Sequence, residues 1–87
     1  MINDSDQIVT LAAAEEFARE RVRVDSIICR GTVAGIFNIT FGNTEILVNT
    51  TAEQLTMQLA MNRGVNYIRL NSGPTNARLY VLLTKAR

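Results

Sequence analysis

Hydrophobic and polar residues alternate most regularly in the middle of the chain. Over residues 36–41 every second residue is Phe or Ile, with Asn or Thr between them, which is the period of a strand with one buried face. Residues 42–44 (Gly-Asn-Thr) interrupt the pattern before an apolar run returns over 45–49, so we predict a hairpin. Similar β-branched and aromatic runs predict further strands over residues 26–33, 65–70 and 77–84.

Two other segments have the composition of helices. Residues 7–23 include four alanines and neither Gly nor Pro, and residues 4–6 (Asp-Ser-Asp) are suited to cap a helix there. Residues 50–53 (Thr-Thr-Ala-Glu) have the form of a capping box, which predicts a second helix to about Asn62, ended by Gly64.

These elements follow one another in the order α-β-β-β-α-β-β. Five strands and two helices favour an α+β fold, a two-layer sandwich with both helices on one face of a mainly antiparallel sheet of about five strands. The length of 87 residues predicts a single domain over 1–87, and the hydrophobic fraction of 47% is enough for a core.

Charge and composition limit the classes of partner and the location. The net charge is +1, so the chain has no strong field to attract DNA or anionic lipid, although eight of its nine basic residues are Arg. An acidic, polar start and the absence of a long apolar run give no sign of export or membrane insertion. We therefore expect a cytoplasmic protein, of a bacterium or of a cell that hosts a virus.

The residues that most enzymes use are scarce in this sequence. There is no His, which is the commonest general base and a common metal ligand. Cys29 is the only cysteine and lies in an apolar predicted strand, where a buried thiol is unreactive. The carboxylates show no spacing that would bring two of them together. We expect no catalytic residue, no metal site and no cofactor.

Arginine and tyrosine residues supply the candidate binding surfaces. If residues 65–70 and 77–84 pair as a hairpin, one sheet face carries the four residues Tyr67, Arg69, Arg78 and Tyr80. Such a face suits a protein interface or the stacking of single-stranded bases, and it is also compatible with an ordinary amphipathic outer face. Arg19 and Arg23 lie on one side of the end of the predicted first helix, as a second candidate patch.

The first predicted helix carries a second apolar stripe, formed by Val9, Ala13 and Phe17. Met57 and Met61 lie about half a turn from the core stripe of the second helix. These five residues either fill a small core from both sides or form the seam of a homodimer, which is the oligomeric state we predict.

The sequence as a whole predicts a small non-catalytic protein-binding module. An inhibitor or an assembly subunit encoded by a virus or a mobile element fits this description. The alternative is a nucleic-acid-binding module that uses the Arg and Tyr residues of its sheet face.

Overall fold

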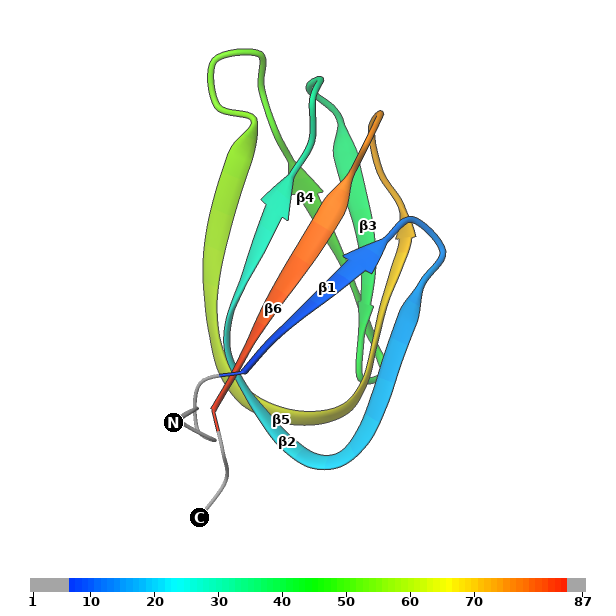
Figure 1. The fold of residues 1–87 in the computed structure, drawn as a ribbon, viewed down its shortest axis with the longest axis vertical. Coiled ribbons are helices and arrows are strands. Elements are labelled where there is room, and N and C mark those ends of the chain that lie inside the picture. The colour runs from blue at the N-terminus through cyan, green and yellow to red at the C-terminus, as the bar shows by residue number, and fades with distance from the viewer. Residues whose placement is uncertain (1–6, 85–87) are drawn as a thin grey trace.

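The described part of the chain is built from strands alone. The computed structural model describes residues 7–84, without the side chains of Gln7, Thr84 and residues 19–22. These residues form no helix, and their six strands are β1 (Gln7–Ala12), β2 (Glu16–Arg30), β3 (Ile36–Phe41), β4 (Thr44–Asn49), β5 (Thr56–Ser72) and β6 (Arg78–Thr84). The α+β prediction is therefore wrong, because both predicted helices are replaced by strands and turns (Figure 1).

The strands form one sheet in the order β1-β6-β2-β5-β3-β4. Every neighbouring pair is antiparallel, which confirms this part of the prediction. The strand β6, the last in the chain, lies between β1 and β2, so the order in the sheet differs from the order in the sequence.

The strands β2 and β5 are too long to run straight. At about 3.3 Å per residue, strands of 15 and 17 residues would span roughly 50 and 55 Å, but the longest dimension of the molecule is 39 Å. Their pairing shifts register twice, once between Ala18 and Val22 and once between Val24 and Ser26. These irregularities bend both strands, as β-bulges do, and Asn62 adopts a left-handed φ of 48° on the β5 side of the bend.

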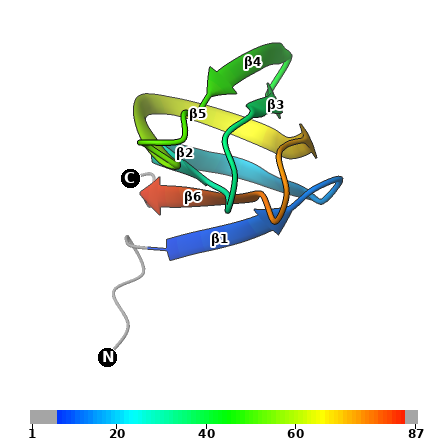
Figure 2. The ribbon, with the colours of Figure 1, turned by 90° about the horizontal axis from the view of Figure 1, so that it is seen from above.

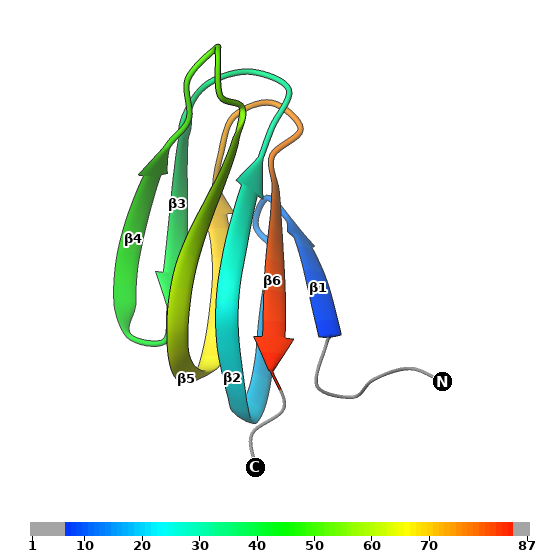
Figure 3. The same ribbon diagram turned by 90° about the vertical axis from the view of Figure 1, so that its left-hand side faces the viewer.

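The bends fold the sheet onto itself in two layers. The first layer contains β1, β6, the second half of β2 and the first half of β5, and the second layer contains the other two half-strands with β3 and β4. Figure 3 shows β4 and β3 on one side, β6 and β1 on the other, and the bent strands between them. The view along the molecule in Figure 2 shows the same stacking.

The inward-facing residues of both layers make one apolar core. Phe37, Ile39 and Phe41 of β3 are buried, as the alternation predicts, and they pack with Ile68 and Leu70 of β5. The opposite layer contributes these buried side chains: Leu11, Val24, Ile27, Cys29, Leu79, Val81 and Leu83.

The predicted hairpin between residues 36 and 49 is confirmed. Phe41 pairs with Thr44 across the two-residue turn Gly42-Asn43, and Gly42 has a φ of 67°. A Gly with positive φ at the first central position is typical of a type II′ turn, whose twist matches that of the strands it joins.

The predicted first helix is replaced by β1, a tight turn and the first half of β2. The chain turns at Ala14, whose φ is 68°, and the backbone N–H of Ala12 donates to Oε1 of Glu15 at 2.6 Å. The turn is fixed to the second layer, because the N–H of Ala14 donates to the carbonyl of Leu70 at 2.7 Å. Packing between layers therefore overrides the helix propensity of an Ala-rich segment. The expected cap at residues 4–6 lies outside the described residues.

The predicted second helix is also absent. Thr50 does not cap a helix but joins two loops, since its hydroxyl accepts from the N–H of Gly35 at 3.1 Å and donates to the carbonyl of Gly35 at 3.2 Å. Thr51 and Gln54 close a short turn through backbone bonds of 3.0 and 3.2 Å. The residues that follow enter β5, with Met57 and Leu59 packed against the core.

Candidate functional site

Tyr67 and Arg69 lie on the outer face of the second layer, where they contact a single carboxylate. The hydroxyl of Tyr67 donates to Oε1 of Glu16 at 3.2 Å, and the Nη1 atom of Arg69 lies 3.2 Å from the same oxygen. Next to them, Asn71 donates through Nδ2 to Asn38 at 3.1 Å and to Thr40 at 2.8 Å. These polar groups therefore bond to one another.

Arg78 and Tyr80 are not neighbours of that pair. We expected all four residues on one hairpin, but β5 and β6 are not adjacent, because β2 separates them in the sheet. The second half of β5, with Tyr67 and Arg69, pairs with β3 and with the start of β2, whereas β6 belongs to the other layer. The predicted four-residue surface is thus divided between the two outer faces of the sandwich.

The outer face of the first layer, which we call the β6 face, is defined by the residues that alternate with the core positions of its four strands. The register of these strands arranges the residues in three rows. Ala12, Arg78, Arg30 and Thr56 form the first row, Thr10, Tyr80, Ile28 and Gln58 the second, and Ile8, Leu82, Ser26 and Ala60 the third. These rows contain two arginines and no acidic residue.

Arg30 and Arg78 face each other directly across β2 and β6. Neither arginine forms an ion pair with any described residue, and Nη1 of Arg78 donates only to the carbonyl of Ala77, at 2.9 Å. The adjoining loops carry Glu15 and Glu53, and neither carboxylate pairs with these guanidinium groups. Like charges directly opposite each other on a sheet are unfavourable, so this pair has a cost in the free protein.

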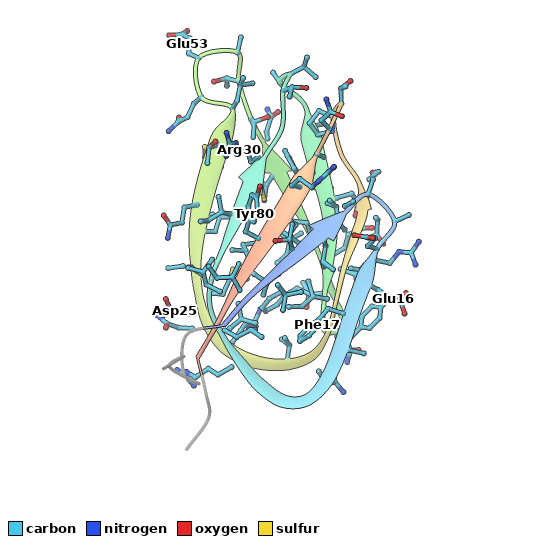
Figure 4. All side chains as sticks on the ribbon, viewed as in Figure 1. Glu16, Phe17, Asp25, Arg30, Glu53 and Tyr80 are labelled. Carbon is cyan, nitrogen blue, oxygen red and sulfur yellow. The ribbon has the colours of Figure 1, made fainter. Side chains whose placement is uncertain are left out.

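Below the arginine pair, the β6 face becomes aromatic and then aliphatic. Tyr80 lies between Thr10 and Ile28 in the second row, and its strand neighbour Leu82 lies beside Ile8 in the third. Figure 4 shows Tyr80 and Arg30 on the neighbouring strands β6 and β2, with Glu16 on the other side of the molecule. Ile8 is 66% exposed, and it is one of four large apolar side chains that are exposed among the described residues.

The second candidate patch lies at the bend of β2. Arg23 is exposed there, and its Nη2 atom lies 3.5 Å from the carbonyl of Asn62, while the side chain of Arg19 is outside the described part of the structure. Arg63 of β5 is close by in the register, and its guanidinium carbon lies 5.7 Å from the centroid of the Phe41 ring. Arg63 is therefore engaged in a cation–π contact with Phe41. Among the described residues, Arg23 and Arg63 do not form an enclosed cationic site.

The residues expected to form a dimer seam do not share one surface. Val9, Phe17, Met57 and Met61 are partly buried and pack against the core of their own chain, whereas Ala13 is exposed in the turn after β1. The helical stripe that motivated the seam does not exist, because this segment forms strands. The homodimer itself stays a prediction without that seam.

Cys29 is fully buried in β2, as the sequence predicts. Burial raises the pKa of its thiol from 9.0 to about 11, so the thiolate is strongly disfavoured at neutral pH. Among the side chains that the structure describes, no three His, Cys, Asp or Glu residues lie together as metal ligands.

No family model, curated protein or solved structure matches this chain. Across the described residues, no helix is long and apolar enough to cross a membrane. The interpretation of the β6 face therefore depends on its own geometry. The predicted site did not include Ile8, Ile28 or Arg30 of this face. Ile28 and Arg30 lie in the strand predicted over 26–33, whereas Ile8 was assigned to a helix, although alternation over 21–24 and 56–61 was a readable signal of strands in the two segments predicted as helices.

The opposition of Arg30 and Arg78 predicts that removing one charge stabilises the free protein. We expect Arg30→Gln to raise the free energy of unfolding by roughly 0.2–1 kcal/mol at low salt, the usual size of a cross-strand pair effect. Urea denaturation measures this change. The control is Arg69→Gln, which removes the partner of Glu16 and gives no such gain. Equal losses of stability in the two variants would show that Arg30 and Arg78 do not repel each other.

Proposed function

We propose that this chain is a non-catalytic protein-binding module whose contact surface is the β6 face. The observation that carries the proposal is the contrast between the two outer faces. On the second layer, Glu16 satisfies both Tyr67 and Arg69. On the β6 face, Arg30 and Arg78 have no carboxylate partner among the described residues.

The residue types of the β6 face are those that protein interfaces favour. Tyr and Arg are enriched among the residues that contribute most binding energy, and a central aromatic side chain with apolar neighbours is a common anchor. Tyr80 holds this position, with Ile28 beside it and Leu82 next along its strand. The central strand of the face, β6, is an interior strand with a hydrogen-bonded neighbour on each side.

A binding role also fits the chemistry of the chain. The sequence contains no His, and the thiol of Cys29 is buried with a raised pKa. The β6 face carries no carboxylate that could act as a general base. An inhibitor and an assembly subunit are both modules of this kind.

Binding of single-stranded nucleic acid is the second candidate, and the two arginines near Tyr80 favour it. Stacking surfaces of that kind combine several aromatic side chains with a basic groove along the backbone. The β6 face offers a single aromatic residue, because Tyr67 lies on the other layer and is bonded to Glu16. The face also has no cation beyond its first row. A protein partner therefore fits it better.

Capture of partners from the native cell lysate tests this proposal. The tagged chain, its Tyr80→Ser variant and its Tyr67→Ser variant are incubated with lysate before and after nuclease treatment, and retained proteins are quantified by mass spectrometry. We expect one retained protein that Tyr80→Ser reduces about tenfold or more, as loss of an interface Tyr does. The Tyr67→Ser variant is the matched control, because it removes the same side chain from the opposite face, and it retains the partner.

Two results would contradict the proposal. Loss of every partner after nuclease treatment would favour the nucleic-acid alternative. Equal retention by the two tyrosine variants would place the contact surface away from the β6 face.

A further inference from the structure

The two arginines at the loop end of the β6 face are arranged as a receptor for an anion. Arg30 and Arg78 are opposite one another in register, and among the described residues neither has an ion-pair partner. Of the described carboxylates, Glu16 pairs with Arg69 and Glu15 accepts from the backbone N–H of Ala12, and none forms an ion pair with Arg30 or Arg78. An anion placed between the two guanidinium groups would remove their repulsion and receive charge-assisted hydrogen bonds from both.

The surroundings of the pair favour a carboxylate over the phosphates of a nucleic acid. A nucleic-acid backbone carries a charge at each nucleotide and needs cations along its whole path. The second and third rows of the β6 face provide none, and the large side chains they present are Tyr80, Ile28, Leu82 and Ile8. A ligand that fits has one charged end and an apolar remainder, which is the chemistry of an acidic segment of a protein.

The spacing of the rows indicates how such a segment is arranged. Successive rows are two residues apart along each strand, which corresponds to roughly 7 Å. An extended peptide presents every second side chain on one side at the same interval. A strand-like segment lying along β6 therefore brings residue i to Arg30 and Arg78, residue i+2 to Tyr80, and residue i+4 to Leu82.

We propose that the β6 face binds an extended acidic segment of a partner protein, with an Asp or Glu at position i held between Arg30 and Arg78 and apolar residues at i+2 and i+4. This inference rests on the proposed protein-binding function and adds to it the chemical class of the bound segment. The arginine pair selects the acidic residue, and Tyr80 with its aliphatic neighbours supplies the remaining contact.

Titration with defined peptides, followed by two-dimensional amide NMR of the whole chain, tests this inference. The probe is a blocked peptide with the alternating sequence Glu-Thr-Val-Thr-Leu, and the comparison peptide has Gln in place of Glu. We expect the Glu peptide to shift amides of β6 and of the second half of β2 and to bind about tenfold more tightly than the Gln peptide. The difference decreases as salt is added, because the exposed charges are screened.

Variants separate the arginine pair from net charge. We expect the double variant Arg30→Gln/Arg78→Gln to bind the Glu peptide and the Gln peptide with equal, weak affinity. In the control Arg63→Gln with Arg69→Gln, which removes the same two charges at other places, the preference for the Glu peptide persists. Dispersed amide spectra for both double variants establish that they are folded.

Three results would overturn the inference. The first is equal affinity of the wild type for the Glu and Gln peptides, including no binding of either at millimolar concentration. The second is tighter binding of a thymidine oligonucleotide than of the Glu peptide on the same residues. The third is a lysate partner whose capture depends on Tyr80 but is unchanged in the Arg30→Gln/Arg78→Gln double variant. That result would support the protein-binding function and reject the proposal that the bound segment is acidic.

Discussion

The Phe37→Ala variant is expected to unfold at a much lower urea concentration than the wild type at room temperature. Phe37 is completely buried at the start of β3, between the two layers. Replacing a buried Phe with Ala removes apolar contacts and leaves a cavity, at about 3–5 kcal/mol. A domain of this size is stable by only about 5–10 kcal/mol, so the loss is a large fraction of the total. Urea denaturation measures it, and the melting temperature falls by roughly 15 °C or more.

The neighbouring residue provides the control for this substitution. Ile36 belongs to the same strand, but it points to the opposite face and is 57% exposed. We expect Ile36→Ala to change the free energy of unfolding by less than about 0.5 kcal/mol, as surface substitutions usually do. A similar loss in both variants would contradict the assignment of residues 36–41 to a strand with one buried face.

The central hairpin could be predicted because its local signals agree with its environment. Residues 36–41 face the core with every second side chain, and the turn contains a Gly where a left-handed backbone is required. Strand alternation, turn chemistry and packing therefore all indicate one structure. Arg78 and Tyr80 were placed on one outward face of their strand correctly for the same reason, since the alternating residues Leu79, Val81 and Leu83 are buried.

The N-terminal segment was misassigned because its local signals point away from its structure. Four alanines and a favourably spaced Glu–Arg pair, Glu15 and Arg19, raise helix propensity. The turn that separates β1 from β2 has no turn signature, because the left-handed position is occupied by Ala14 and not by Gly or Asn. Contacts with Leu70 of β5, distant in sequence, hold this turn in place.

The candidate site could be predicted in composition but not in arrangement. The sequence identifies Arg78 and Tyr80 as outward-facing residues of one strand, and the structure places them on the β6 face. Their neighbours depend on the strand order, which puts β2 and not β5 beside β6. Arg30 and Ile28 come to this face through a pairing across about fifty residues of chain. This pairing depends on the bends in β2 and β5, and no local sequence pattern predicts it.

Alkaline pH is expected to destabilise the protein through Cys29. Burial raises the pKa of this thiol from 9.0 to about 11 in the folded chain. Between these two pH values the unfolded chain loses the thiol proton while the folded chain keeps it. The unfolded state then binds fewer protons, so the free energy of unfolding falls as pH rises. Below pH 9 both states keep the proton, and this contribution is constant.

The expected loss between pH 9 and 11 is about 2–3 kcal/mol, since each pKa unit corresponds to about 1.4 kcal/mol. Urea denaturation of the wild type and of Cys29→Ala over this range measures it. All other titratable groups are the same in both proteins, so the difference between their slopes isolates the thiol. The variant begins less stable, because it leaves a small cavity, but it loses less stability as pH rises. Parallel pH dependences in the two proteins would show that the Cys29 thiolate is tolerated in the fold, and that the side chain is more accessible to solvent than its burial in β2 implies.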